Sequence, residues 1–132
     1  MIKTILVVDD IAFVRKTLTE IFTEAHYEVI GEAADGKEAI DLFNKLKPDL
    51  VTLDLVMPKM SGIEAARQII KSDPHAKIMM ITAMSQENLV MEAINAGVRD
   101  YLLKPFAAQD VLRTAERILF GDHLINSKPR ST

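Results

Sequence analysis

Short runs of apolar residues alternate along the chain with segments in which apolar residues recur every three or four positions. The short runs are rich in β-branched residues and are typical of buried strands; they cover residues 3–8, 27–33, 49–53, 77–81 and 100–103. Each run is followed by an apolar stripe with a helical period, which is typical of an amphipathic helix. The pattern therefore predicts five strands that alternate with five helices.

Residues with capping or helix-breaking character mark where these helices begin and end. Asp10 or a neighbouring residue can cap the first helix. Asp35 and Ser61 each precede a glutamate by three residues, which is the spacing of a capping box and predicts the starts of the second and third helices. The fourth helix is expected to end at Gly97, a natural left-handed C-terminal residue, and the fifth to stop at Gly121.

The order of the elements predicts an α/β fold. Successive parallel strands need a crossover between them, so the helices cover both faces of a single, doubly wound parallel sheet. The second strand ends without reactive groups, as suits an edge strand, and the strand order 2-1-3-4-5 brings the polar ends of the other four strands together. Residues 1–120 form the one predicted domain. Residues 121–132 are expected to be a flexible C-terminal tail, because the hydrophobic period is lost there.

Composition excludes several classes of protein. A chain of 132 residues with 48% hydrophobic and 27% charged residues has enough apolar material for one buried core. Its apolar runs are too short to cross a membrane, so we expect a cytoplasmic protein. The absence of cysteine excludes disulfides, thiolate zinc sites and a thiol nucleophile. With 16 basic and 19 acidic residues and no basic run, the chain is not expected to bind nucleic acid, and we expect a monomer.

Polar residues stand where four of the five predicted strands end. Asp9 and Asp10 follow the first strand, Asp54 follows the third, Thr82 ends the fourth and Lys104 follows the fifth. Ligands of open α/β sheets bind at this edge. Carboxylates that converge there repel one another unless a cation compensates them, and oxygen-only ligation suits Mg²⁺. The sequence therefore predicts a magnesium site.

A magnesium site of this kind invites a phosphoryl group. Asp54 can then act as the nucleophile that forms an acyl phosphate. Lys104 would offset the charge on the transferred oxygens, and Thr82 can donate a hydrogen bond to one of them.

These residues belong to motifs that resemble a known family. The motifs are Val7-Val8-Asp9-Asp10, Asp54 with Met57-Pro58 and Gly62, Thr82-Ala83, and Lys104-Pro105-Phe106. Together, over roughly residues 1–120, they resemble the receiver domain of two-component response regulators. The segment from Thr82 to Tyr101 is most similar to the chemotaxis regulators of that family. The resemblance implies a flavodoxin-like fold.

The resemblance also implies roles for individual residues. Asp54 matches the phosphorylated aspartate, and Asp9, Asp10, Asp54 and the backbone carbonyl of Val56 match the magnesium ligands. The implied phosphoryl donor is a histidine kinase or a small acyl phosphate. The implied output partner is a flagellar motor switch protein or another effector, and a phosphatase is a further possible partner.

Thr82 and Tyr101 match the switch pair of the family. On phosphorylation the hydroxyl of Thr82 is expected to move toward the phosphoryl group and the ring of Tyr101 to turn inward. Lys104 matches the lysine that pairs with the phosphoryl group, and its bond to Pro105 is expected to be cis.

Two further features bear on how such a switch works. Val56 and Met84 are apolar residues that would flank the path of an attacking water, so we expect slow loss of the phosphoryl group from Asp54. The apolar residues of the fourth helix spread around more than one face. They predict either a partner site beside Tyr101 or a wide buried stripe.

Other functions remain compatible with parts of this pattern. A phosphorelay shuttle, or the receiver of a longer regulator, would carry the same motifs. A magnesium-dependent phosphohydrolase would also use an aspartyl phosphate. However, Asp54-Leu55-Val56 lacks the second acid that would serve that enzyme as general acid and base.

Overall fold

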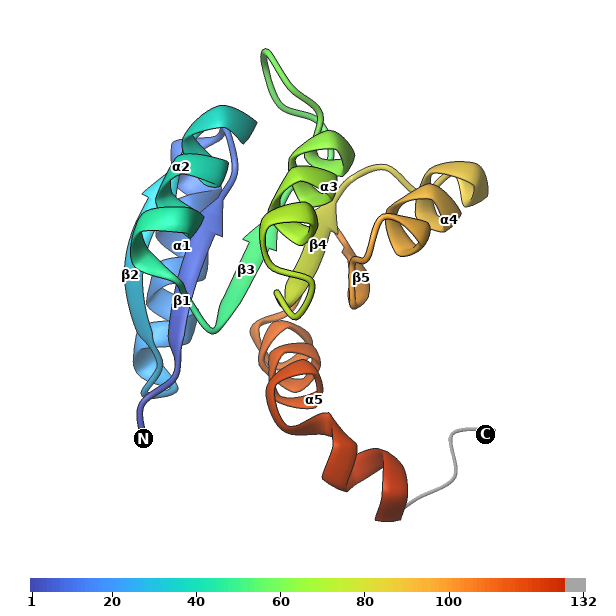
Figure 1. Ribbon diagram of the computed structural model, residues 1–132. Coiled ribbons are helices and arrows are strands. Elements are labelled where there is room, and N and C mark those ends of the chain that lie inside the picture. The colour runs from blue at the N-terminus through green and yellow to red at the C-terminus, as the bar shows by residue number, and fades with distance from the viewer. Residues whose placement is uncertain (128–132) are drawn as a thin grey trace.

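The computed structural model describes residues 1–127, with side chains through residue 121. Strands and helices alternate along the chain as the sequence predicts (Figure 1). In order they are β1 (Thr4–Val8), α1 (Ala12–Glu24), β2 (Glu28–Ala33), α2 (Gly36–Leu46), β3 (Leu50–Leu53), α3 (Gly62–Ser72), β4 (Ile78–Thr82), α4 (Glu87–Asn95), β5 (Asp100–Leu103) and α5 (Ala108–Ser127). Within residues 1–127, no helix is both long and apolar enough to cross a membrane.

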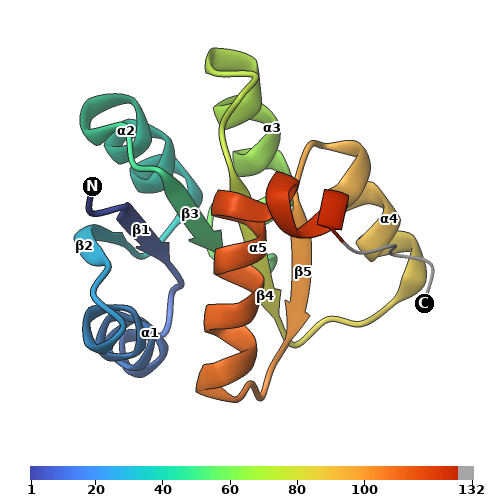
Figure 2. The same cartoon turned by 90° about the horizontal axis from the view of Figure 1, so that it is seen from below.

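The strands form one parallel sheet in the order β2-β1-β3-β4-β5, which confirms the predicted topology. Helices α1 and α5 cover one face, and α2, α3 and α4 cover the other (Figure 2). The chain changes its winding direction between β1 and β3. The carboxyl ends of these two strands therefore border the crevice where such sheets bind ligands.

Each central strand contributes side chains to two hydrophobic cores, one on each face of the sheet. Ile5 and Val7 of β1 pack with α1 and α5, whereas Leu6 and Val8 pack with α2 and α3. All four side chains are almost fully buried. Because alternate residues of a strand point to opposite faces, a continuous apolar run is what a sheet covered on both faces requires. Each such side chain contributes about 1.5–3 kcal/mol of burial free energy.

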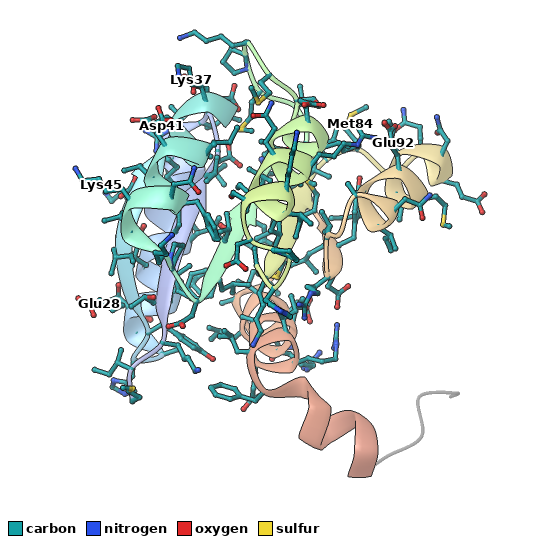
Figure 3. All side chains as sticks on the ribbon, viewed as in Figure 1. Glu28, Lys37, Asp41, Lys45, Met84 and Glu92 are labelled. Carbon is teal, nitrogen blue, oxygen red and sulfur yellow. The ribbon has the colours of Figure 1, made fainter. Side chains whose placement is uncertain are left out.

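Helix α2 shows how the helical period divides core from solvent. Ala39 and Phe43 lie on its buried face. Lys37, Asp41 and Lys45 line its outer face (Figure 3). The Lys37 and Asp41 side chains approach to 3.8 Å in an exposed pair, which adds little to stability.

The two predicted capping motifs are confirmed at the starts of α2 and α3. Asp35 Oδ1 accepts a hydrogen bond of 2.9 Å from the Glu38 N–H, and Ser61 Oγ accepts one of 3.1 Å from the Glu64 N–H. Glu38 also reaches back to accept from the Ala34 N–H at 2.8 Å. A cap of this type is worth about 1 kcal/mol.

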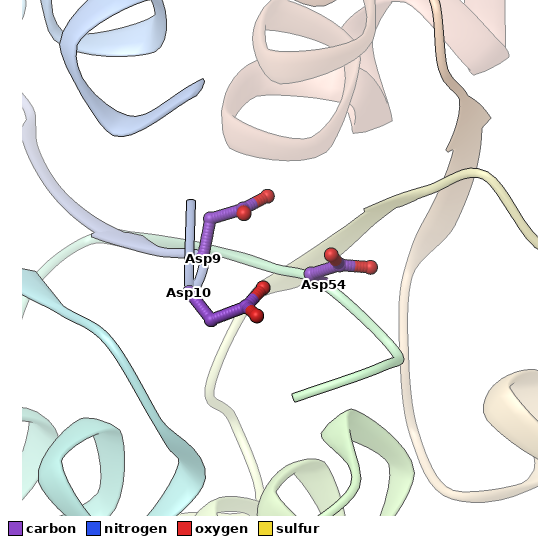
Figure 4. Close-up of side chains that lie close together, drawn as sticks. All are labelled: Asp9, Asp10 and Asp54. Carbon is purple, nitrogen blue, oxygen red and sulfur yellow. The ribbon is translucent and has the colours of Figure 1, made fainter. Parts of the chain in front are cut away.

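The prediction that Asp10 or a neighbouring side chain caps α1 is wrong. Ile11 occupies the N-cap position, and no side chain caps this helix. The Ile11 N–H instead donates to Asp9 Oδ1 at 2.9 Å. The Asp10 carboxylate lies with those of Asp9 and Asp54 in an acidic cluster at the sheet edge and does not cap the helix (Figure 4).

The prediction that the last helix stops at Gly121 is also wrong. Helix α5 continues through this residue to Ser127. A glycine within a helix costs only about 1 kcal/mol relative to alanine, so it does not by itself end one. By contrast, Gly97 takes a φ of 107° just beyond α4, as predicted. Of the predicted tail, 128–132 lie outside the described residues.

Candidate functional site

Three carboxylates meet at the carboxyl edge of the sheet. Asp9 and Asp10 come from the end of β1 and Asp54 from the end of β3, and each offers an oxygen within 4.8 Å of the others (Figure 4). Asp9 and Asp54 are 1% and 6% exposed, while Asp10 is exposed to solvent. The structure therefore brings together the three acids that the sequence placed at one strand edge.

Lys104 enters this cluster from the turn between β5 and α5. Its Nζ donates hydrogen bonds of 2.8 Å to Asp9 Oδ2 and 3.1 Å to Asp54 Oδ2. One ammonium thus bridges carboxylates that lie 45 positions apart in the chain. The peptide bond between Lys104 and Pro105 is cis, as the family resemblance implied.

The charges of this cluster do not balance. Burial raises the pKa of Asp9, outweighing its hydrogen bonds to Lys104 and to the Ile11 N–H. Burial alone would lower the pKa of Lys104, but its hydrogen bonds to Asp9 and Asp54 outweigh that effect and raise it. Three carboxylates face one ammonium, so a further cation is favoured. An all-oxygen donor set of this kind fits Mg²⁺.

The backbone beneath Asp54 depends on a glycine. A Cβ built on Gly62 would lie 2.0 Å from the carbonyl oxygen of Asp54. The Gly62 N–H also donates to the Leu55 carbonyl at 2.7 Å, which folds the start of α3 against the end of β3. Only a residue without a side chain permits this approach.

Arg15 is a supporting residue that the sequence analysis missed. Its guanidinium donates to the Asp9 backbone carbonyl at 2.7 Å and to Glu32 Oε1 at 3.1 Å. These contacts tie α1 and β2 to the segment that carries the acids. A lone arginine on a predicted helix gives no sequence signal for this role.

The two predicted switch residues meet at one loop residue. Thr82 is fully buried at the end of β4, and its Oγ1 accepts a long hydrogen bond of 3.4 Å from the Met84 N–H. Tyr101 is half-buried, and its hydroxyl donates to the Met84 carbonyl at 2.5 Å. Burial and the negative charge of Asp54 both raise the pKa of Tyr101. Met84 lies in the loop between β4 and α4 (Figure 3). Because it bonds to both side chains, it links Thr82 to Tyr101.

Val56 stands beside Asp54 with its side chain 53% exposed. Its N–H donates a long hydrogen bond of 3.4 Å to Asp54 Oδ1. The role of its carbonyl as a metal ligand stays a prediction.

The fourth helix exposes two of its five apolar residues and leaves two more half-buried. Ala93 is the one buried residue of α4, which is described along its whole length. Met91 and Ile94 are 51% and 47% exposed, and Leu103 on neighbouring β5 is 45% exposed. Of the two alternatives for this helix, the structure favours an exposed face that a partner can cover.

Sequence comparison identifies the family to which this arrangement belongs. Residues 5–116 match the response regulator receiver domain. The chain therefore belongs to the response regulator receiver family. A receiver is the signalling module of a two-component system, which agrees with the acidic cluster and the paired Thr82 and Tyr101.

This receiver is similar to proteins of nearly the same length. It is 48% identical over 116 residues to the chemotaxis protein CheY of Thermotoga maritima, covering 88% of this chain and 97% of that protein. It is 50% identical over 115 residues to the protein CcdB of Bacillus subtilis, covering 87% and 96%. A solved CheX-CheY-BeF3-Mg+2 complex from Borrelia burgdorferi contains a chain that matches with a TM-score of 0.86 and 36% identity, over 88% of each chain.

Proposed function

We propose that the protein is a phosphorylation-dependent switch in which Asp54 accepts a phosphoryl group from a histidine kinase or a small acyl phosphate. The supporting observation is the Lys104 ammonium, held by hydrogen bonds between Asp54 and Asp9. It places a fixed positive charge beside the carboxylate that would be phosphorylated. Such preorganised charge is how phosphoryl transfer is stabilised.

The side chains divide the chemistry between them. An Asp54 carboxylate oxygen attacks phosphorus, and the bond from phosphorus to the donor breaks with its electron pair on the donor. Lys104 and the Thr82 hydroxyl then interact with the transferred oxygens. Asp9, Asp10, Asp54 and the Val56 carbonyl would hold Mg²⁺, which when bound supplies positive charge to those same oxygens.

Signal output follows from the contacts at Met84. Thr82 and Tyr101 bond the N–H and the carbonyl of the same residue. A Thr82 hydroxyl drawn toward a phosphoryl group would release its contact with the Met84 N–H, and the loop held by Tyr101 would shift. The face formed by α4, β5 and α5 would then change its affinity for a partner, to the extent that the partner binds the two arrangements with different free energies.

The proposed setting is chemotaxis in the cytoplasm. The similarity to CheY supports a chemotaxis kinase as donor and a flagellar motor switch protein as output partner. The solved complex that pairs CheX with CheY supports a phosphatase as a further partner. The exposed Met91, Ile94 and Leu103 provide the apolar face for such binding.

Phosphorylation by acetyl phosphate with Mg²⁺ tests the proposal. Intact-mass measurements should show a single added phosphoryl group on the wild type and none on Asp54→Asn. Equal labelling of the two proteins would contradict the assignment of Asp54.

A second output is also proposed. The protein CcdB is as similar to this chain as CheY is, so sequence identity alone does not single out chemotaxis as the output. A phosphorelay shuttle, or the receiver of a longer regulator, would pass the signal elsewhere. Transfer of the phosphoryl group from Asp54 to a histidine phosphotransfer protein, without binding to a motor switch protein, would favour this alternative. Multiple turnover of p-nitrophenyl phosphate would instead favour the phosphohydrolase.

A further inference from the structure

An apolar pocket opens directly beside the Asp54 site. It has a volume of about 460 Å³ and lies between the first half of α1 and the turn that leads into α5. Its lining residues are Phe13, Val14, Thr17, Ala83, Lys104, Pro105 and Phe106. Both helices lie on the same face of the sheet (Figure 2). None of the lining residues belongs to α4, β5 or α5, which form the proposed output surface.

The walls of the pocket differ in how firmly they are held. Phe106 and Val14 are half-buried and pack against the core under α1 and α5. Phe13 is 75% exposed, although it is a large aromatic residue. The proposed function leaves this exposed aromatic residue without a role.

The pocket is continuous with the phosphorylation site through two residues. Lys104 lines the pocket and also places its Nζ 3.1 Å from Asp54 Oδ2. Ala83 lines the pocket and directly follows Thr82. A group bonded to a phosphoryl that approaches Asp54 is therefore within a side chain's length of the pocket.

We propose that this pocket binds the apolar acyl portion of a small acyl phosphate, so that the protein prefers aromatic acyl phosphates to acetyl phosphate as donors. The inference rests on the proposed function of Asp54. Its basis is complementarity: the cavity is apolar, and its edge reaches the Asp54 site, where the Lys104 ammonium and a bound Mg²⁺ would receive the anionic phosphoryl end of such a donor. The volume is in the lower part of the range for small-molecule sites.

The reaction remains the one proposed for Asp54. An Asp54 oxygen attacks phosphorus, and the bond from phosphorus to the acyl oxygen breaks. Its electron pair leaves with that oxygen as an aromatic carboxylate, and no proton or further reactant is needed. The pocket contributes by holding the acyl group, which raises the local concentration of the phosphoryl group.

The test compares two donors on each protein. Rates of labelling with benzoyl phosphate and acetyl phosphate are measured below saturation, with Mg²⁺, and the ratio of the two rates is the readout. Partial burial of a phenyl ring against Phe13 and Phe106 should make this ratio on the order of tenfold larger in the wild type than in Phe13→Ala. Because Phe13 is exposed, its replacement should leave the fold intact.

Phe120→Ala is the matched control. Phe120 is a 42% exposed phenylalanine in α5 whose ring lies 5.5 Å from Lys3 Nζ, near the start of β1 and away from the acids that follow this strand. Its replacement should leave the donor ratio at the wild-type value. The ratio also cancels any damage to Asp54 or to metal binding, since both donors use the same site.

A second measurement does not depend on transfer. Benzoylphosphonate, which cannot donate its phosphoryl group, should shift the aromatic ring resonances of Phe13 and Phe106 more than acetylphosphonate does.

The outcomes separate this inference from the proposed function. No labelling of Asp54 by either donor would contradict the proposed function itself. Labelling by both donors with the same ratio in wild type and Phe13→Ala would overturn the pocket assignment alone. If Phe13→Ala keeps the wild-type donor ratio but accepts the phosphoryl group more slowly from a phosphohistidine protein, the surface serves a protein donor and the pocket assignment is likewise overturned.

Discussion

Binding of Mg²⁺ should stabilise the fold by an amount that can be stated in advance. Asp9 and Asp54 are almost fully buried, and with Asp10 they place three carboxylates beside the single ammonium of Lys104. This arrangement forms only when β1 and β3 are paired, so the unfolded chain offers no comparable site. A ligand that binds the folded state alone, at 100 times its dissociation constant, stabilises by about 2.7 kcal/mol.

For a chain of 132 residues this free energy corresponds to a rise in melting temperature of about 10 °C. Thermal unfolding in EDTA and in saturating Mg²⁺ measures it. Asp10→Asn is the informative variant, because Asp10 is exposed and its loss should leave the metal-free melting temperature nearly unchanged. The Mg²⁺-induced rise should fall to a few degrees. Asp41→Asn removes an exposed acid of α2 and should retain the full rise.

Equal melting temperatures of the wild type in EDTA and in Mg²⁺ would refute the proposed metal site. So would a loss of the Mg²⁺-induced rise in Asp41→Asn as large as the loss in Asp10→Asn. The effect would then come from general screening of a chain with net charge −3 rather than from a bound ion.

Three further predictions concern the same edge of the sheet. Val56→Asn combined with Met84→Glu should shorten the lifetime of phosphorylated Asp54 several-fold, because polar groups can then orient an attacking water. Intact mass measured over time follows the loss of the phosphoryl group. A loss from the double variant that is as slow as in wild type, or slower, would refute this prediction. The raised pKa of Asp9 means that its charged form is disfavoured in the folded state, so its contribution to stability declines as pH rises from the ordinary value of 3.8 through the folded value. Asp9→Asn should therefore raise the metal-free melting temperature at neutral pH, with the gain vanishing below about pH 3.8, and an equal gain across that range would contradict the burial argument. Gly62→Ala should destabilise the fold by about 3 kcal/mol in urea titrations, since its Cβ would overlap the carbonyl of Asp54, and unchanged stability would show that the loop can yield.

The fold is predictable because each apolar run and each helical stripe corresponds to one strand or helix of a doubly wound sheet. The run from Ile5 to Val8 is apolar at every position, which suits a strand covered on both faces, and β1 is indeed buried on both. Capping residues such as Asp35 act through neighbours three positions away, so their effect is visible locally. Errors arose where a local signal is weak. Gly121 predicts an end to the last helix, but α5 continues to Ser127 because glycine opposes a helix by only about 1 kcal/mol.

The site was predictable in its members but not in its contacts. Chemistry at strand ends identified the acids and Lys104, since a parallel sheet gathers such ends at one edge. The hydrogen bonds that Thr82 and Tyr101 form with the backbone of Met84 depend on side-chain positions, which the periodicity of the sequence does not determine. The contact of Arg15 with the Asp9 carbonyl is likewise set by the packing of α1 on the sheet.

The charge of the chain takes on a local meaning at this edge. Without Asp9, Asp10 and Asp54 the chain would carry as many acids as bases, because its excess is three acidic residues. Lys104 already offsets one of these charges, which leaves an excess of about two within a single cluster. The remaining negative charge equals in magnitude the charge of one divalent cation. A phosphoryl group adds further negative charge, so its transfer to Asp54 should depend strictly on the cation, whereas folding should depend on it only by the few kcal/mol estimated above.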